Sequence, residues 1–216
     1  MLSFVEGSNH PPFEWTPLLA MLVLLGASIV TYVMLVRRWT SRRQWVSLAQ
    51  WARESGYQLL PLRRAALPGP LQEIVRDDAH VRFHLCDPRT TLAQFETSPV
   101  KPDAPAPQWN VLVRHRPGVG PSAGLRPAAP ALSLIDLLPL GKFASMSLGE
   151  RFVVYASEPS AARRLAESHA VALVPQDVGL ILLENHLVLD FSSRPFDPIE
   201  FGRVIALADQ LARVIS

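Results

Sequence analysis

The residues best suited to chemistry lie in one short segment, residues 79–86, which reads Ala-His-Val-Arg-Phe-His-Leu-Cys. Apolar and polar side chains alternate along it, and this period of two predicts a β-strand with one buried face. The polar face would carry His80, Arg82, His84 and Cys86. Two imidazoles and a thiolate can begin a zinc site, and a cysteine beside a histidine can form a nucleophile pair.

Strand geometry limits this interpretation. Residues two apart on a strand lie about 6–7 Å from each other, so their side chains share a metal only if they bend towards it. The sequence names no further ligand. The alternative is that these residues form the solvated face of an edge strand, which is the interpretation we favour. His80, His84 and Cys86 therefore stay weak metal-ligand candidates, and neither a catalytic residue nor a cofactor is predicted.

Other motifs with chemical meaning are weaker still. His115, His169 and His186 are isolated in the sequence. The glycines of residues 118–124 lack the spacing of a phosphate-binding loop, and Gly141-Lys142 is followed by phenylalanine where a P-loop needs serine or threonine.

A different kind of segment gives the strongest pattern, the uncharged stretch Pro17–Val36. At about 1.5 Å per residue, some twenty helical residues cross the roughly 30 Å hydrocarbon core of a bilayer. Trp15 and Trp39 stand at its two edges, where tryptophan favours the membrane interface. A cleaved signal peptide fits less well, because a basic n-region is missing and Arg37-Arg38 stand where small residues should be. We expect a single transmembrane helix.

Charges predict the orientation of this helix. Residues 1–16 hold two acidic and no basic residues, and residues 37–64 hold seven arginines against one glutamate. The rest of the chain holds fourteen basic and sixteen acidic residues, which gives a net charge of +2 overall. Because positively charged flanks stay in the cytoplasm, we expect the N-terminus outside and the C-terminal domain in the cytoplasm. The predicted membrane-interface residues are Trp15, Arg37, Arg38, Trp39, Arg42 and Arg43.

The basic residues beside the predicted span also bear on partners. Arginine with tryptophan can bind nucleic acid, but interfacial anchoring explains the same residues beside a membrane, so the expected partner is the lipid bilayer and no nucleic acid. Only Lys101 and Lys142 are lysines, which is typical of a GC-rich bacterial genome and indicates a cell inner membrane. Cys86 is the only cysteine, so the chain forms no intrachain disulfide and suits a reducing compartment.

The pattern predicts four regions. They are a short extracytoplasmic tail (1–16), the transmembrane helix (17–36), a basic juxtamembrane helix (37–56) and a soluble cytoplasmic α+β domain (57–216). Expected strands come in runs rather than alternating with helices, which favours a mainly antiparallel sheet. They cover residues 57–62, 79–86, 91–95, 109–115, 132–138, 151–156, 180–183 and 186–191. Mobile loops rich in Pro, Ala and Gly are expected near 98–108 and 117–131.

Helix starts are marked most clearly after residue 196. Asp197 is the expected N-cap, Pro198 the first helical residue, and Glu200 the partner in a capping box. Phe196 and Phe201 occupy the two positions of a hydrophobic staple. An earlier helix is expected to be capped by Ser157.

Three functional hypotheses follow. The first is a non-enzymatic, membrane-tethered module that binds or assembles with another protein, because no catalytic motif is present. The second is a metal- or thiol-dependent enzyme that uses the His84 and Cys86 face. The third is a sensor that responds to lipid or ligand through the juxtamembrane helix.

Overall fold

The computed structural model describes residues 15–60, 71–72, 80–99, 105–116, 121–129, 132–138, 144–183 and 185–215, although the side chains of residues 15–18, 20, 37, 38, 40, 41, 80 and 144 are not described. The chain divides into two compact units, Met1–Val46 and Ser47–Ser216. The tail 1–14 and parts of both predicted loops lie outside the described residues.

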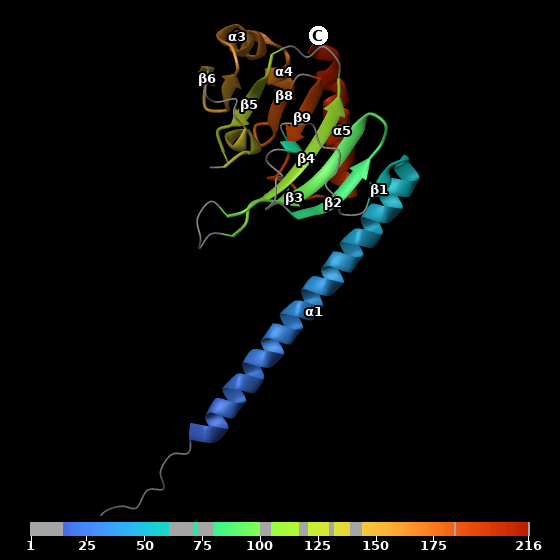
Figure 1. Ribbon diagram of the computed structural model, residues 1–216, viewed down its shortest axis with the longest axis vertical. Helices are drawn as coiled ribbons and strands as arrows, with labels where there is room; N and C mark the ends of the chain where they lie inside the picture. Colours follow the sequence, from blue (N-terminus) through green and yellow to red (C-terminus); the bar gives the residue numbers. More distant parts are fainter. Residues whose placement is uncertain are drawn as a thin grey trace, which may run out of the picture. The chain divides into compact units, whose positions relative to one another are not determined.

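Helix α1 (Trp15–Ser55) is one continuous element, so the predicted segments 17–36 and 37–56 form a single helix (Figure 1). It ends at Gly56, whose φ of 76° suits a residue without a side chain. The N–H of Tyr57 then donates to the carbonyl of Ala52 at 2.8 Å. This is the hydrogen bond of a Schellman motif, in which Gly56 ends the helix.

The second unit is built on one antiparallel sheet of nine described strands, so the predicted α+β class with a mainly antiparallel sheet is confirmed. The strand order is β1-β2-β3-β4-β9-β8-β5-β7-β6. The strands are β1 (Gln58–Leu60), β2 (His80–Cys86), β3 (Thr90–Glu96), β4 (Gln108–His115), β5 (Ala123–Pro127), β6 (Ala144–Leu148), β7 (Phe152–Ala156), β8 (Gly179–Leu183) and β9 (His186–Asp190). The helices are η1 (Leu134–Leu137), α3 (Pro159–Glu167), α4 (Ala170–Leu173) and α5 (Pro198–Val214).

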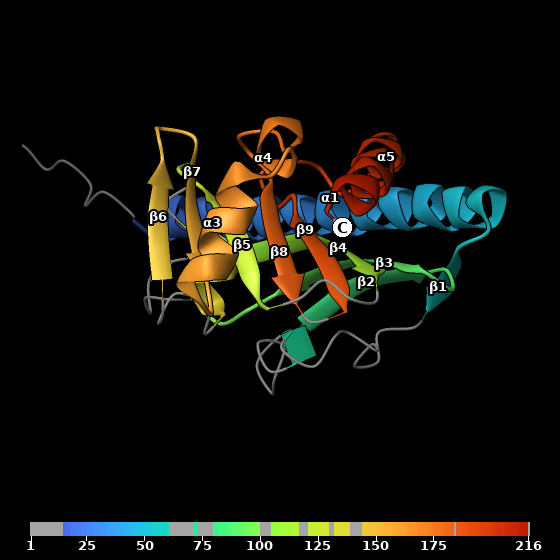
Figure 2. The same cartoon turned by 90° about the horizontal axis from the view of Figure 1, so that it is seen from above.

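One row of apolar side chains crosses all nine strands on the same face. From edge to edge it comprises Leu59, Leu85, Leu92, Leu112, Leu189, Leu180, Leu125, Val154 and Met146. Helices α3, α4 and α5 cover this face (Figure 2). Helix α5 packs on this face through one apolar stripe, in which Phe201, Val204, Ala208 and Leu211 are all buried.

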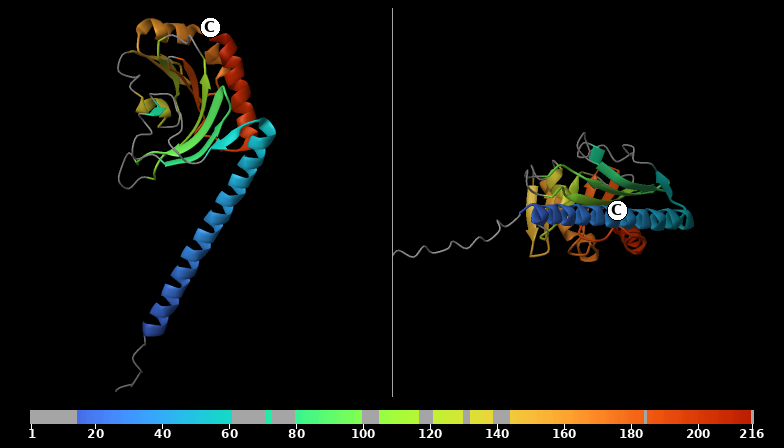
Figure 3. Two further views of the ribbon diagram at one scale, coloured as in Figure 1. Left: turned by 45° about the vertical axis from the view of Figure 1, so that its right-hand side comes forward. Right: turned by 90° about the horizontal axis from the view of Figure 1, so that it is seen from below.

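The opposite face is also apolar. Phe95, Trp109, Val113 and Val188 form a second core with Leu71 and the residues of η1. Figure 3 shows η1 on the concave side of the curved sheet, with α5 on its convex side. Burial on both faces explains why several strands read as continuous apolar runs rather than alternating ones.

Two helix starts test the sequence predictions. Asp197 accepts a hydrogen bond from the Glu200 N–H at 2.9 Å, and the rings of Phe196 and Phe201 meet at 4.7 Å, so the N-cap and the staple are confirmed. The Glu200 side chain binds arginines instead of completing the capping box. Helix α3 is capped by Glu158 and not by Ser157.

The predicted mobile loop 117–131 is wrong for its central part, because β5 lies there, paired with both β7 and β8. Small residues bury little apolar surface of their own, but in β5 they permit close packing: a Cβ on Gly124 would lie 2.4 Å from Cδ1 of Ile135 and 2.9 Å from the Leu180 carbonyl oxygen. The predicted strand 132–138 is correspondingly the 3₁₀ helix η1, which packs over β5.

Candidate functional site

Strand β2 does not present the single polar face that alternation predicts. Its register with β3 shifts between Val81 and Phe83. A bulge of this kind reverses the side to which the following residues point. His84 and Cys86 therefore lie on the same face as Val81, whereas the register position of His80 is on the other face.

His84 and Cys86 are also poorly suited to the predicted chemistry. His84 is 3% exposed, so the favoured interpretation as a solvated edge face is wrong for it. Strand β2 is not at the edge either, because β1 pairs with it on the outer side. Burial lowers the pKa of His84, and burial together with Asp87 raises the pKa of Cys86. A protonated thiol beside a neutral imidazole is the reverse of an activated pair. Within the described residues no three His, Cys, Asp or Glu side chains are placed to hold a metal.

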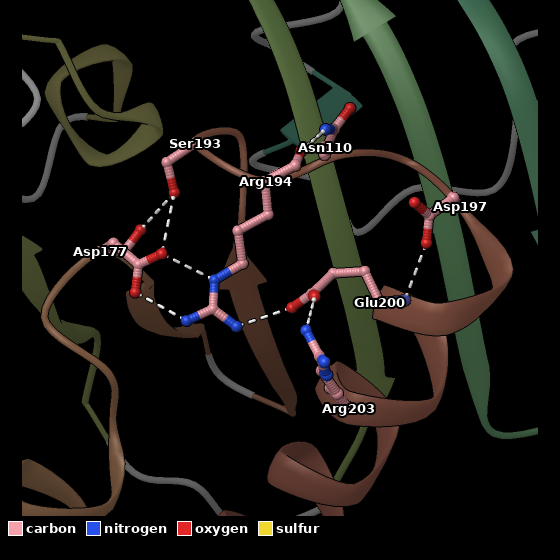
Figure 4. A network of polar contacts seen from close by, with 7 residues as sticks. All are labelled: Asn110, Asp177, Ser193, Arg194, Asp197, Glu200 and Arg203. Atoms are coloured by element: carbon pink, nitrogen blue, oxygen red, sulfur yellow. Dashed lines mark hydrogen bonds and ion pairs between the residues drawn. The ribbon is translucent and has the colours of Figure 1, made fainter.

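The densest polar cluster is centred on Arg194, in the turn between β9 and α5 (Figure 4). Its Nε and Nη2 donate to the two oxygens of Asp177 at 2.7 and 2.6 Å, and its Nη1 donates to Glu200 at 2.6 Å. Glu200 is 4% exposed and also accepts from Arg203 at 3.2 Å. The forked contact raises the pKa of Arg194 and lowers the pKa of Asp177. The ion pair of Arg194 with Asp177 therefore stays charged at any physiological pH.

This Arg194 cluster is tied to the middle of the sheet. The carbonyl of Arg194 accepts from the Asn110 side chain at 2.7 Å, and Asn110 in turn accepts from Gln94 at 2.9 Å. Asn110 and Gln94 are both buried. Hydrogen bonds thus connect β3 and β4 with the turn that starts α5, which identifies the cluster as a structural clamp.

A second buried carboxylate, Asp190, holds the 3₁₀ helix η1 on the opposite face of the sheet. It accepts from the Ser133 hydroxyl at 3.1 Å and from the Leu134 N–H at 2.9 Å, and it also accepts from Ser192. These bonds hold the start of η1 on the end of β9. Both carboxylate oxygens are used inside the protein, so Asp190 is a positioning group for η1 and not a free acid.

Aromatic rings connect the last turns of α1 to the sheet. The Trp51 ring lies 4.9 Å from both Tyr57 and Phe201, and Phe196 stacks against Phe83 at 5.9 Å. Burial, and secondly the Asp87 carboxylate, raises the pKa of Tyr57 to about 12. The end of α1 is therefore part of the hydrophobic core of the second unit.

The first part of α1 is apolar on every side. The large apolar side chains described between Leu19 and Val36 are between 39% and 72% exposed. Within the parts of the chain whose side chains are described, no helix is both long and apolar enough for a bilayer crossing. The predicted segment Pro17–Val36 is covered only in part, because the side chains of residues 17, 18 and 20 lie outside that set.

The predicted membrane-interface residues are described only in part. Trp39 is 57% exposed, and the guanidinium of Arg43 lies 3.6 Å from its ring centroid, a cation–π contact at the surface. Arg42 is also exposed. The side chains of Trp15, Arg37 and Arg38 lie outside the described residues.

Two of the three histidines predicted to be isolated are neighbours. His115 and His186 are register partners in β4 and β9, and their ring centroids lie 5.3 Å apart. The sequence could not reveal this pair, because 70 intervening residues separate them. The Arg194 cluster was missed for the same reason: Asn110 and Arg194 meet only through the sheet.

Comparison of the chain with models of protein families, with curated proteins and with solved structures finds no match.

Proposed function

We propose that this protein is a non-enzymatic module that a single helix, Pro17–Val36, tethers to a membrane and that assembles with other protein chains there. One observation carries the tether: the apolar side chains of α1 from Leu19 to Val36 are exposed around the whole helix. A helix that is apolar all round belongs in a hydrophobic environment, because water opposes the exposure of so much apolar surface. The uncharged stretch in the sequence has the length of a bilayer core.

The arginines give this tether a direction. Arg37 and Arg38 directly follow the span, Arg42 and Arg43 lie one turn further, and residues 1–16 contain no basic residue. The positive-inside rule then places the sheet domain in the cytoplasm and the short tail outside. Exposed Trp39, with Arg43 over its ring, suits the interface on the cytoplasmic side.

Support for a binding module comes from the way the domain uses its polar groups. The clamp at Arg194 and the carboxylate of Asp190 are occupied by internal hydrogen bonds. Burial, with the Asp87 carboxylate, raises the pKa of the Cys86 thiol and so disfavours the thiolate that a nucleophile needs. Such a domain is suited to bind other proteins through its surface rather than to carry out a reaction.

Sided labelling of cysteines tests the tether and its direction together. In a Cys86→Ser background, Ser3→Cys marks the tail and Ser147→Cys marks an exposed position of the domain. A membrane-impermeant maleimide added to intact cells should label the first variant and reach the second only after lysis. Equal labelling of both variants, or recovery of the chain in the soluble fraction, would contradict the proposal.

Assembly is tested separately, by chemical cross-linking of the full chain in its native membrane. We expect covalent adducts larger than the single chain. A chain that yields no adduct at any cross-linker length would contradict the assembly part and leave the tether standing.

A further inference from the structure

Strands β4 and β9 bring two histidines together at one end of the sheet. His115 and His186 are direct register partners, and their ring centroids lie 5.3 Å apart. In the next pair outward, the backbone N–H of Arg116 donates to the carbonyl of Asn185 at 2.6 Å. Hydrogen-bonded and non-hydrogen-bonded pairs alternate along an antiparallel ladder, so the two histidines form a non-hydrogen-bonded pair. The Cα atoms of such a pair are only about 4.5 Å apart, which brings the side chains close together.

Both histidines are accessible to solvent, since His115 is exposed and His186 is half-buried. Strand alternation places them on the same face as Val113 and Val188, whose side chains belong to the second core. Two imidazoles therefore lie side by side where the apolar part of this face ends.

The distance between the rings suits a shared metal ion. Tetrahedral Zn²⁺ binds imidazole nitrogen at about 2.0 Å, which sets the centroids of two bound rings roughly 5 Å apart. The observed distance is 5.3 Å. The ring planes are inclined at 64°, which coordination permits because each ring rotates about its metal–nitrogen bond. Residues two apart on one strand, as His84 and Cys86 are, lie about 6–7 Å apart and lack this closeness.

Positive charges near the pair leave room for a cation. Arg114 and Arg116 flank His115 in the sequence, and alternation places them on the other face, where Arg114 pairs with Asp209 of α5. Arg89 adjoins His115 on the β3 side, where its carbonyl accepts from the His115 N–H at 3.0 Å. The Arg89 side chain is exposed, so water and salt screen its charge.

We propose that His115 and His186 bind a divalent transition-metal ion of the class that prefers nitrogen ligands, represented by Zn²⁺. Imidazole suits Zn²⁺, Cu²⁺ and Ni²⁺, whereas Mg²⁺ takes oxygen ligands. No third His, Cys, Asp or Glu among the described residues joins the pair, so the ion keeps positions for water or for a ligand from elsewhere. This inference goes beyond the proposed function and depends on neither the tether nor the assembly.

A bound ion would fasten the sheet at an internal junction. Strands β1 to β4 meet the other five described strands where β4 pairs with β9. The unfolded chain holds the two histidines apart, so the ion binds the folded state preferentially and stabilises it by mass action. Zn²⁺ should therefore raise the unfolding temperature of the intact chain and leave that of His115→Ala unchanged.

Zinc titration of the full chain tests the site directly. The chain is purified in detergent with a tag that contains no histidine, stripped with a chelator and titrated by calorimetry. We expect at least about tenfold weaker binding after His115→Ala or His186→Ala, because each removes one of the two protein ligands. The double variant should bind hardly less than either single variant, and Mg²⁺ should not bind there.

Two control variants separate this pair from other ligands. His169→Ala removes an exposed histidine elsewhere, and Cys86→Ser removes the only thiol. Both should bind Zn²⁺ like the intact chain. Cu²⁺ binds nitrogen sites at least as tightly as Zn²⁺, and its electron paramagnetic resonance should show two imidazole nitrogens in the intact chain and one in His186→Ala.

Equal Zn²⁺ affinity of the intact chain and the double variant would overturn the site. A Cu²⁺ signal from a single imidazole in the intact chain, or loss of binding in Cys86→Ser alone, would overturn it too. Circular dichroism checks that each variant stays folded. His115 is exposed, so His115→Ala decides the matter by itself if His186→Ala is unstable.

Discussion

Helix α1 contributes to both units, and its two parts differ in the exposure of their apolar side chains. From Leu19 to Val36 these side chains are exposed around the whole helix, whereas Leu48 and Ala52 are 0% and 2% exposed on one side of it. The last turns are ordered by packing on the sheet. The first part has no such packing within its own compact unit. The two parts of the helix are therefore stabilised differently. Variants in the first part should change membrane binding, and variants in the last turns should change the free energy of unfolding.

The largest effect is expected from charge in the exposed part. Leu24 is 69% exposed, and a Cβ at Gly26 would meet nothing within 4 Å, so Leu24→Arg with Gly26→Arg disturbs no packing. Each arginine at the centre of a span costs about 2.5–3.5 kcal/mol of membrane insertion. We expect most of the doubly substituted chain to leave the carbonate-resistant membrane fraction.

Ile199→Arg is the matched control, because Ile199 is 72% exposed but lies at the start of α5. It should not change the membrane fraction. If the double variant and the control show the same membrane fraction, the exposed apolar side chains of α1 contribute no more to membrane binding than an exposed apolar side chain of α5. The proposed difference between the two parts of α1 would then be wrong.

The next effect concerns the packed end of the same helix. Leu48→Ala removes a fully buried side chain and should lower the free energy of unfolding by about 2–5 kcal/mol. Val46→Ala, two residues earlier and 61% exposed, should change it by less than about 0.5 kcal/mol. Denaturant unfolding of the full chain in detergent measures both values. An equal response of the two variants would mean that α1 is not held by the sheet at Leu48.

A somewhat smaller loss is expected at the clamp. Arg194→Met removes the partner of Asp177 and one partner of the buried Glu200, which should cost about 3 kcal/mol of stability. Arg203→Met is the control: Arg203 is 69% exposed and should contribute at most about 1 kcal/mol. Neither variant should alter membrane partition. A larger loss from Arg203→Met would show that Arg203, and not Arg194, stabilises Glu200.

Sequence patterns predicted those elements that depend on residues close together in the sequence. The α5 start depends on residues within five positions of one another, and Asp197, Phe196 and Phe201 take the predicted roles. Most strands were found because apolar residues recur along them. Strand β5 was not predicted because its alanine, glycine and proline give no strong periodicity, although it lies inside the sheet. Strand β6 was not predicted although Ala144, Met146 and Leu148 alternate with two serines along it.

Features that depend on distant residues could not be predicted. Arg194 meets Asp177 and Asn110 only because β8, β9 and β4 are neighbours in the folded sheet. The bulge in β2 comes from its pairing with β3, and it places His84 on the same face as Val81, where His84 is buried. Alternation along one strand contains no information about such a shift.

The smallest effect is a pH dependence at His84, confined to the second unit. Burial lowers the pKa of His84 below that of the unfolded chain, about 6.5. The unfolded state therefore binds the proton first, and this contribution to stability is complete above about pH 6.5 and is lost as pH falls through the lower, folded-state pKa. The carboxylate Asp177, whose pKa is lowered, loses its contribution only at more acidic pH.

Comparison of the intact chain with His84→Gln isolates this contribution. Between pH 7.5 and pH 5 the stability of the intact chain should fall more than that of the variant, whereas His169→Gln, at an exposed position, should follow the intact chain. Membrane partition should not change over the same range, because the apolar part of α1 carries no titratable acid or histidine from residue 17 to 36. If His84→Gln keeps the full acid sensitivity, the imidazole is not the group that titrates, and the burial of this face is less complete than its contacts indicate.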